Sequence, residues 1–162
     1  MHSDTTILYA IKEAKLLGLF KQFAERNKDN ASLLRLRNLF KRTNNSIETS
    51  RNLIKNATGA DLSDDEAARM SELIQAFLAK STYRKPIDDS VKRSLSQRQN
   101  CKCAICRSDI DDNAHVDHIV PFKYVGDALD NNYQLLCPTC NLQKNASLDY
   151  QIRHMLNLVG GN

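Results

Sequence analysis

The sequence has no tryptophan, and aromatic residues make up only 6% of its 162 positions. A hydrophobic core must therefore be built mostly from leucine, isoleucine, valine and alanine. No apolar run approaches the roughly 20 residues that a membrane-spanning helix needs, so we expect no membrane association. The first four residues lack the basic region and the apolar run of a secretory signal peptide, and we therefore expect a cytoplasmic protein.

The composition is that of a soluble globular protein, with 41% hydrophobic and 26% charged residues. The chain is long enough for one ordinary domain, or for a compact module joined to a helical one. Its net charge of +4 is too small to identify a nucleic-acid partner by itself.

The basic residues are concentrated in two segments. Residues 26–55 contain eight basic and two acidic side chains, which gives a local charge of +6. Residues 81–107 contain seven basic and two acidic side chains, which gives a local charge of +5. Such clusters can contact the phosphate groups of DNA. The alternative is that these side chains only form a solvated helix face. The candidate DNA contacts in the first segment are Arg35, Arg37, Lys41 and Arg42.

The first 80 residues show the periodicity of amphipathic helices. Ser63 and Glu66 form a capping-box sequence, which predicts the start of the third of these helices. The polar residues 43–46 are a candidate break within the second helix. Three helices that bury a shared face predict a small N-terminal bundle. The predicted helical stretches are 5–28, 31–57 and 63–78.

Pro86 marks a boundary after the bundle, because a proline disfavours helix at the residue before it. We expect a helical domain at residues 1–82, a linker at 83–90 and a second domain at 91–162. The second domain is predicted to open with a short helix over 91–99 and to end with a helix over 147–159.

Four of the five cysteines form two Cys-x-x-Cys pairs, Cys103/Cys106 and Cys137/Cys140. In a reducing compartment such pairs bind a metal far more often than they form disulfides. Four thiolates leave no open coordination position, so the spacing predicts a structural Zn²⁺. The alternatives are a redox pair, or a ligand set in which Cys101 replaces Cys103 at a less favourable spacing.

Two short strands are predicted between the cysteine pairs, at 114–120 and 133–136. Asp117 and His118 stand side by side near the end of the first strand, where Pro121 forbids further ladder pairing. Pro138 then begins a helix. The hairpin, the helix and the metal ligands are therefore expected to form one folded unit.

In this order, the motifs resemble the HNH endonuclease family, which has a ββα-metal fold, and particularly its members with two zinc-binding Cys-x-x-Cys pairs. The resemblance covers about residues 91–146 and none of the bundle. Together with the helices predicted from periodicity, it implies a mostly helical α+β fold, in which a zinc-stapled ββα-metal module follows the bundle and precedes a C-terminal helix. The matching residues are Cys103-x2-Cys106, Val116 to Pro121, Asp130 to Cys137, Cys140, Asn141 and Lys144.

The chemistry of phosphodiester hydrolysis gives Asp117 and His118 distinct roles. The reaction needs an activated water and a cation that neutralises the phosphate. A neutral imidazole can take a proton from water at pH 7, which makes His118 the candidate general base. Asp117 offers a hard oxygen ligand for a catalytic Mg²⁺ or Mn²⁺. His115 could be a third ligand, but a lone histidine in a strand is more often structural.

The resemblance implies roles for three further residues. Asn141 would be the second ligand of the catalytic ion, in place of the final histidine of many family members, and this change favours Mg²⁺ over zinc. Asn132 would brace a loop and so orient His118, with Asn131 as the neighbouring alternative. Lys144 would contact a phosphate of the substrate.

These observations predict a metal-dependent HNH endonuclease that nicks or cleaves DNA. The alternative is a catalytically silent zinc module that binds nucleic acid or a protein partner. The N-terminal helices would grip DNA, bind a protein partner that supplies targeting, or mediate self-association. The residue pattern leaves DNA and RNA open as substrates.

Overall fold

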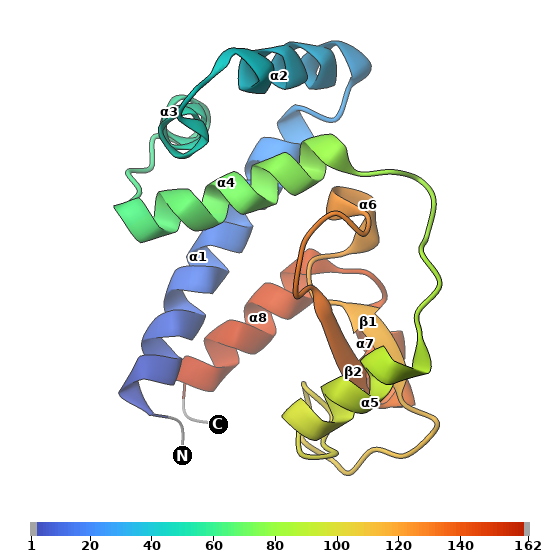
Figure 1. Cartoon of the computed structure of the whole chain (residues 1–162). Helices are drawn as coiled ribbons and strands as arrows, with labels where there is room; N and C mark the ends of the chain where they lie inside the picture. The colour runs from blue at the N-terminus through green and yellow to red at the C-terminus, as the bar shows by residue number, and fades with distance from the viewer. Residues whose placement is uncertain (1–2, 161–162) are drawn as a thin grey trace.

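The computed structural model describes residues 3–160, which fold into eight helices and one two-stranded sheet (Figure 1). The predicted class, a mostly helical α+β fold, is confirmed. In chain order the elements are α1 (Asp4–Arg26), α2 (Asn30–Arg42), α3 (Ser46–Thr58), α4 (Asp64–Ala79), α5 (Asp89–Arg98), β1 (His115–His118), α6 (Phe122–Val125), β2 (Tyr133–Leu136), α7 (Pro138–Lys144) and α8 (Leu148–Val159).

Short-range signals in the sequence set the helix ends. The predicted capping box is present, because Ser63 Oγ accepts the N–H of Glu66 at 3.4 Å and Glu66 Oε1 accepts the N–H of Ser63 at 3.0 Å. The second predicted helix is interrupted at residues 43–45, where Asn45 caps α3. Gly59 ends α3 in the left-handed region, at φ 78°, which a glycine adopts without strain.

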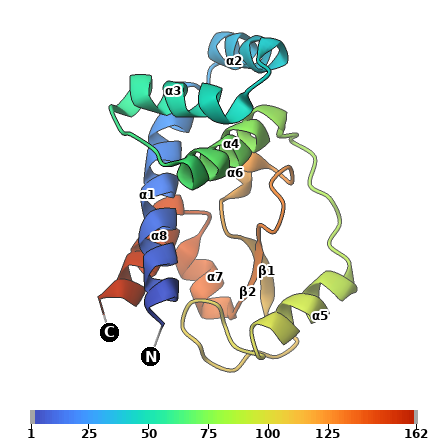
Figure 2. The ribbon, with the colours of Figure 1, turned by 60° about the vertical axis from the view of Figure 1, so that its left-hand side comes forward.

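Helix α1 is the central element of the molecule. Helix α8 packs along it and α4 packs across it, while α2 and α3 lie at its upper end (Figures 1 and 2). Helix α6 packs beneath α4, and α5 packs beside β2. Within residues 3–160, no helix combines the length and the apolar character that crossing a bilayer requires.

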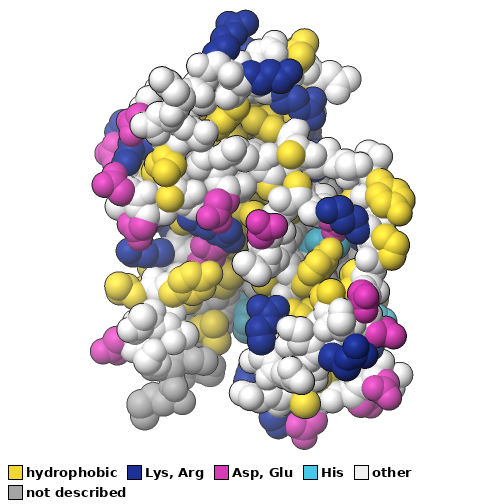
Figure 3. All heavy atoms as spheres, viewed as in Figure 1, with side chains coloured by type: hydrophobic (Ala, Val, Ile, Leu, Met, Phe, Trp, Pro, Cys, Tyr) yellow, Lys and Arg dark blue, Asp and Glu magenta, His cyan; other side chains and the backbone are white. Residues whose placement is uncertain are grey.

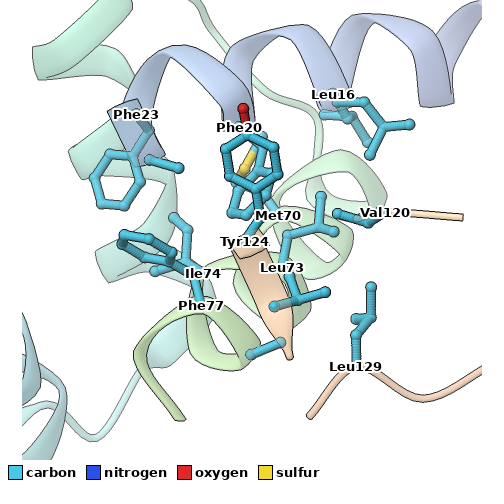
Figure 4. Close-up of a cluster of buried hydrophobic side chains, with 14 of the residues drawn as sticks. Leu16, Phe20, Phe23, Met70, Leu73, Ile74, Phe77, Val120, Tyr124 and Leu129 are labelled. Atoms are coloured by element: carbon cyan, nitrogen blue, oxygen red, sulfur yellow. The ribbon is translucent and has the colours of Figure 1, made fainter. Parts of the chain in front are cut away.

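One hydrophobic core joins the N-terminal helices to elements from the second half of the chain (Figure 4). The ring of Phe20 lies 6.2 Å from that of Phe77 and 6.1 Å from that of Tyr124 in α6. Val125 of α6 and Leu148 of α8 are buried in the same cluster. The loop that follows β1 is therefore anchored on the N-terminal bundle.

The two strands pair antiparallel, with Asp117 opposite Gln134 and His118 opposite Tyr133. Successive residues of a strand point to opposite faces. The Asp117 side chain consequently faces α7 and α8, whereas the His118 side chain faces α6 and the loop after it.

The segment between α4 and α5, expected to be a linker, is exposed but contacts α6 and the loop after it. Residues 80–88 have no regular structure, and residues 89–90 already belong to α5. Lys80 Nζ donates to the carbonyl of Lys123 at 3.0 Å, and the Arg84 guanidinium lies 4.1 Å from the ring centre of Phe122. The segment therefore contributes to the surroundings of His118, whose ring packs edge-on against Phe122.

Candidate metal centre and nuclease site

The four paired cysteines come together in one cluster. Their sulfur atoms all lie within 4.8 Å of one another, and the Sγ atoms of Cys106 and Cys137 are 3.8 Å apart. In a tetrahedral site with Zn–S bonds of about 2.3 Å, neighbouring sulfurs are separated by about 3.8 Å. The cluster therefore fits a zinc ion bound by Cys103, Cys106, Cys137 and Cys140. Cys101 is exposed and lies outside the cluster, so the alternative ligand set with Cys101 is wrong.

Backbone and hydroxyl groups around the cluster favour thiolates. The backbone N–H of Cys137 donates to Cys103 Sγ, and that of Cys140 donates to Cys137 Sγ, both at 3.4 Å. Hydrogen bonds from Ser108 lower the pKa of Cys106 to about 6. Burial, together with the neighbouring sulfurs, raises the pKa of Cys140. A bound cation would offset the charge of four crowded thiolates, as expected for a structural metal site.

Asp117 lies in a buried polar network on the helical side of the sheet. Its Oδ2 forms an ion pair with Lys144 Nζ at 2.9 Å and accepts a hydrogen bond from Gln134 Nε2 at 3.0 Å. Gln134 also donates to Gln151 Oε1 of α8 at 3.0 Å. The network ties β1 and β2 to α7 and α8, and it neutralises the charge of Asp117 inside the protein.

Lys144 lies inside the protein rather than at its surface. Its side chain is fully buried, and its ammonium group donates to the carbonyl oxygen of His118 at 2.8 Å while it pairs with Asp117. A buried ammonium group needs such partners because it has lost its hydration. The Lys144 side chain has no exposed surface, so the predicted phosphate contact would require it to leave this buried position.

His118 is held by an acidic residue that the sequence analysis did not single out. Its Nε2 lies 2.7 Å from Asp127 Oδ1, which also accepts the hydroxyl of Tyr133 at 2.9 Å. Burial acts to raise the pKa of Asp127, but hydrogen bonds from His118, the Lys85 N–H and Tyr133 outweigh it and lower this pKa. Asp127 was missed because it lies in an irregular loop nine residues after His118, at a spacing that matches no motif.

Asn132 braces the turn that follows β1. Its side-chain Oδ1 accepts the N–H of Val120, and its Nδ2 donates to the carbonyl of the same residue, both at 2.8 Å. Its backbone carbonyl accepts the N–H of Ile119 at 2.9 Å. This geometry is compatible with the predicted role of orienting His118. Asn131, the neighbouring alternative, is exposed.

Three polar groups of the predicted site have no hydrogen-bond partner among residues 3–160: His118 Nδ1, Asp117 Oδ1 and the side-chain amide of Asn141. No buried side-chain nitrogen or oxygen in that part of the chain lacks a partner, so these groups must reach solvent. Asn141 lies one turn before Lys144 and so on the same face of α7. His115, at the start of β1, is exposed.

The four basic residues predicted to contact DNA are exposed on α2, but they do not share one face. With 3.6 residues per turn, Arg35 and Arg42 point in nearly the same direction, whereas Arg37 and Lys41 lie on roughly the opposite side of the helix. Arg37 Nε donates to the carbonyl of Leu78 at 2.9 Å. Lys and Arg side chains are visible at the upper end of the molecule, over α2 (Figure 3).

The segment that forms this site matches a known family. Residues 103–147 match the family model described as HNH endonuclease, and the match includes both cysteine pairs and the Asp117-His118 sequence. The resemblance inferred from the sequence is thus confirmed for this segment. The expected role of such a segment is nuclease activity or nucleic-acid binding. Residues 1–102 lie outside the match. No curated protein and no solved structure matches the chain.

Proposed function

We propose that the protein is a metal-dependent endonuclease that hydrolyses DNA phosphodiester bonds, by nicking one strand or cutting both. The observation that carries the proposal is the HNH segment at residues 103–147, in which the strand β1 ends at His118 and Asn132 braces the turn that follows. The four-cysteine cluster closes the base of this unit and would hold a structural zinc.

His118 is the proposed general base. It lies at the end of β1, and its Nδ1 has no protein partner among the described residues. A water molecule that attacks the phosphorus atom passes one proton to the imidazole of His118. The new O–P bond forms while the bond from phosphorus to the 3′ oxygen breaks, and the 3′ oxygen takes up a proton from solvent.

Asp117 Oδ1 and the side-chain oxygen of Asn141 are the proposed ligands of a catalytic Mg²⁺ or Mn²⁺. Both groups offer a ligand oxygen that reaches solvent, so the two residues fit a divalent ion of this kind. A divalent ion held there would neutralise the phosphate and stabilise the 3′ leaving oxygen. Lys144 occupies the other oxygen of Asp117 and fixes the orientation of that carboxylate.

A second candidate function is a catalytically silent zinc module that binds nucleic acid or a protein partner. One observation favours it: the buried ammonium group of Lys144 already neutralises Asp117, which lowers the demand for a second cation. The two candidates share the zinc cluster and differ in whether DNA is cut.

The test is cleavage of supercoiled plasmid by the purified zinc-loaded protein with Mg²⁺, Mn²⁺ or EDTA. We expect metal-dependent nicking or linearisation that His118→Ala abolishes. His115→Ala, at an exposed histidine of the same strand, is the matched variant and is expected to cleave normally. Circular dichroism and zinc content show whether each variant keeps the fold.

Absence of cleavage by a folded, zinc-loaded protein with every metal would contradict the nuclease and leave the silent module. Loss of activity in His115→Ala would instead assign His115 as a third ligand. Single-stranded DNA and RNA, assayed beside the plasmid, identify the substrate class.

A further inference from the structure

We propose that Asp127 is a positioning residue for His118: it holds the imidazole as the Nε2–H tautomer and leaves Nδ1 as the basic nitrogen that faces water. The proposal rests on the proposed nuclease function, and it adds a residue that lies outside every motif of the sequence. Three structural observations support it.

The first observation is that Asp127 acts as a hydrogen-bond acceptor at both oxygens. Oδ1 accepts from the Tyr133 hydroxyl at 2.9 Å, and Oδ2 accepts from the backbone N–H of Lys85 at 2.8 Å. The side chain is only 6% exposed, so these donors replace the water that would otherwise solvate it. An ionised carboxylate has no proton to donate.

The second observation concerns the nitrogen that faces this carboxylate. His118 Nε2 lies 2.7 Å from Asp127 Oδ1, and because the carboxylate only accepts, Nε2 must be the donor. A neutral imidazole carries one N–H, so its lone pair is then at Nδ1. That nitrogen has no partner within residues 3–160 and reaches solvent, where an attacking water would lie.

The third observation is that the loop carrying Asp127 is fixed from both sides. At Gly126, φ is 55°, and a Cβ atom there would lie 3.1 Å from both Lys80 Cβ and the carbonyl oxygen of Ser81. Glycine therefore permits a close approach of the loop to residues 80–85. On the other side, Tyr124 is buried in the core and donates its hydroxyl to Glu25 of α1 at 2.8 Å.

These contacts give the N-terminal half of the chain a part in the reaction. The loop is held by α1, by the end of α4 and by the segment that follows α4, and it presents Asp127 to His118. The segment expected to be a simple linker thus supplies a hydrogen bond to the residue that orients the base.

Asp127→Asn is the informative variant because it keeps the size of the side chain. An amide can donate or accept, so it no longer selects one tautomer of His118. We expect kcat for DNA cleavage to fall roughly 10- to 100-fold, by analogy with the loss of a hydrogen-bond partner that orients a metal-ligating histidine, with little change in KM. Asp130→Asn, at an exposed position of the same loop, is the matched control and should keep kcat.

The direct readout is the ¹⁵N spectrum of the histidine imidazoles in the zinc-loaded full-length protein, recorded where they are neutral. The His118 signals are assigned by their loss in His118→Ala. We expect wild type to show His118 protonated at Nε2 and unprotonated at Nδ1, and Asp127→Asn to show a mixture of tautomers.

An Nδ1–H tautomer in wild type overturns the proposal, and that measurement needs no variant that might fail to fold. An unchanged tautomer and unchanged kcat in folded Asp127→Asn overturn it as well. The spectrum is independent of cleavage, so the two proposals can fail separately. The expected tautomer without cleavage contradicts only the nuclease, whereas cleavage with the other tautomer contradicts only the role of Asp127.

Discussion

At the scale of residues, the site contains two carboxylates on opposite faces of the same strand pair. Asp117 faces α7 and is neutralised by the buried ammonium group of Lys144, while Asp127 faces the other side and accepts from His118. The two acids thus have different surroundings, which suit the different roles proposed for them. Asp117 would bind a cation through its remaining oxygen, and Asp127 would orient the imidazole of His118.

Lys144→Met removes the charge from the buried pair and keeps most of the side-chain volume. We expect the free energy of unfolding to fall by about 3 kcal/mol, because Asp117 would be left largely buried without its partner. Urea unfolding followed by circular dichroism measures the change. Lys28→Met, at an exposed pair with Glu25, is the control and should change stability by less than about 1 kcal/mol.

The double variant Asp117→Asn with Lys144→Met tests the pairing itself. Removing both charges should recover part of the lost stability, since neither buried group is then uncompensated. If Lys144→Met kept its stability and instead weakened DNA binding, the lysine would contact phosphate after all.

The residues that could be predicted are those whose spacing along the chain reflects the chemistry. The four cysteines, the Asp117-His118 pair and Asn132 follow a local pattern, and the structure places the cysteines together and Asn132 against the turn. Asp127 could not be found this way, because its partner is reached through space from an irregular loop. The burial of Lys144 could not be predicted either, because a charged side chain is normally exposed and burial cannot be read from one residue.

At the scale of elements, the cysteine cluster is expected to bind one zinc ion per chain. Cys103→Ser should lose the zinc and lower the melting temperature, because Cys103 is a buried member of the cluster. Cys101→Ser, only two residues away, should keep both the bound zinc and the melting temperature of the wild type. Zinc content by atomic emission and thermal unfolding with and without chelator measure the outcome. An equal loss of zinc and of thermal stability in the two variants would indicate a general structural defect of this turn.

Helix α2 offers a comparison between two pairs of basic residues. If the helix grips DNA, one face must contact it, and we expect that face to be Arg35 and Arg42, because Arg37 is already bound to the carbonyl of Leu78. Arg35→Ala with Arg42→Ala should lower DNA affinity and reduce the slope of log affinity against log salt by up to about 1.8, or 0.9 per phosphate contact.

Arg37→Ala with Lys41→Ala removes the same charge from the opposite side of α2 and serves as the control. A filter-binding or fluorescence titration over a range of salt concentrations measures both variants. Equal effects of the two pairs would indicate only a general loss of charge. No effect of either pair would leave a protein partner or self-association as the role of this helix.

At the scale of the whole molecule, the sequence predicted the kinds of elements better than their assembly. The helices, the strand pair and the capping box follow from local periodicity and from side chains near helix ends. Helix α6 and its packing into the N-terminal core were not predicted, because a segment of four residues is too short to show a helical period. The chain division at residues 83–90 remains a proposal.

This shared core makes the stability of the second half depend on the first. Removing residues 1–82 would expose Val120, Tyr124, Val125 and Leu148, which are buried in the cluster with α1 and α4. At roughly 1.5–3 kcal/mol for each large apolar side chain, the loss is about 6–12 kcal/mol, comparable to the whole stability of an ordinary domain. The fragment 83–162 is therefore expected to lose the order of α6 and α8.

The zinc cluster should survive in that fragment, because Cys103, Leu136 and Cys140 form a separate buried cluster beside β2. We expect the fragment to bind zinc but to show sharp dispersed amide signals only near the cysteines, and not to cleave DNA, since the loop carrying Asp127 loses its support. The full chain should unfold in one urea transition, with the same midpoint for helix content and for Tyr fluorescence. A folded, active fragment, or two separate transitions in the full chain, would show that the nuclease module is stable without the helical bundle.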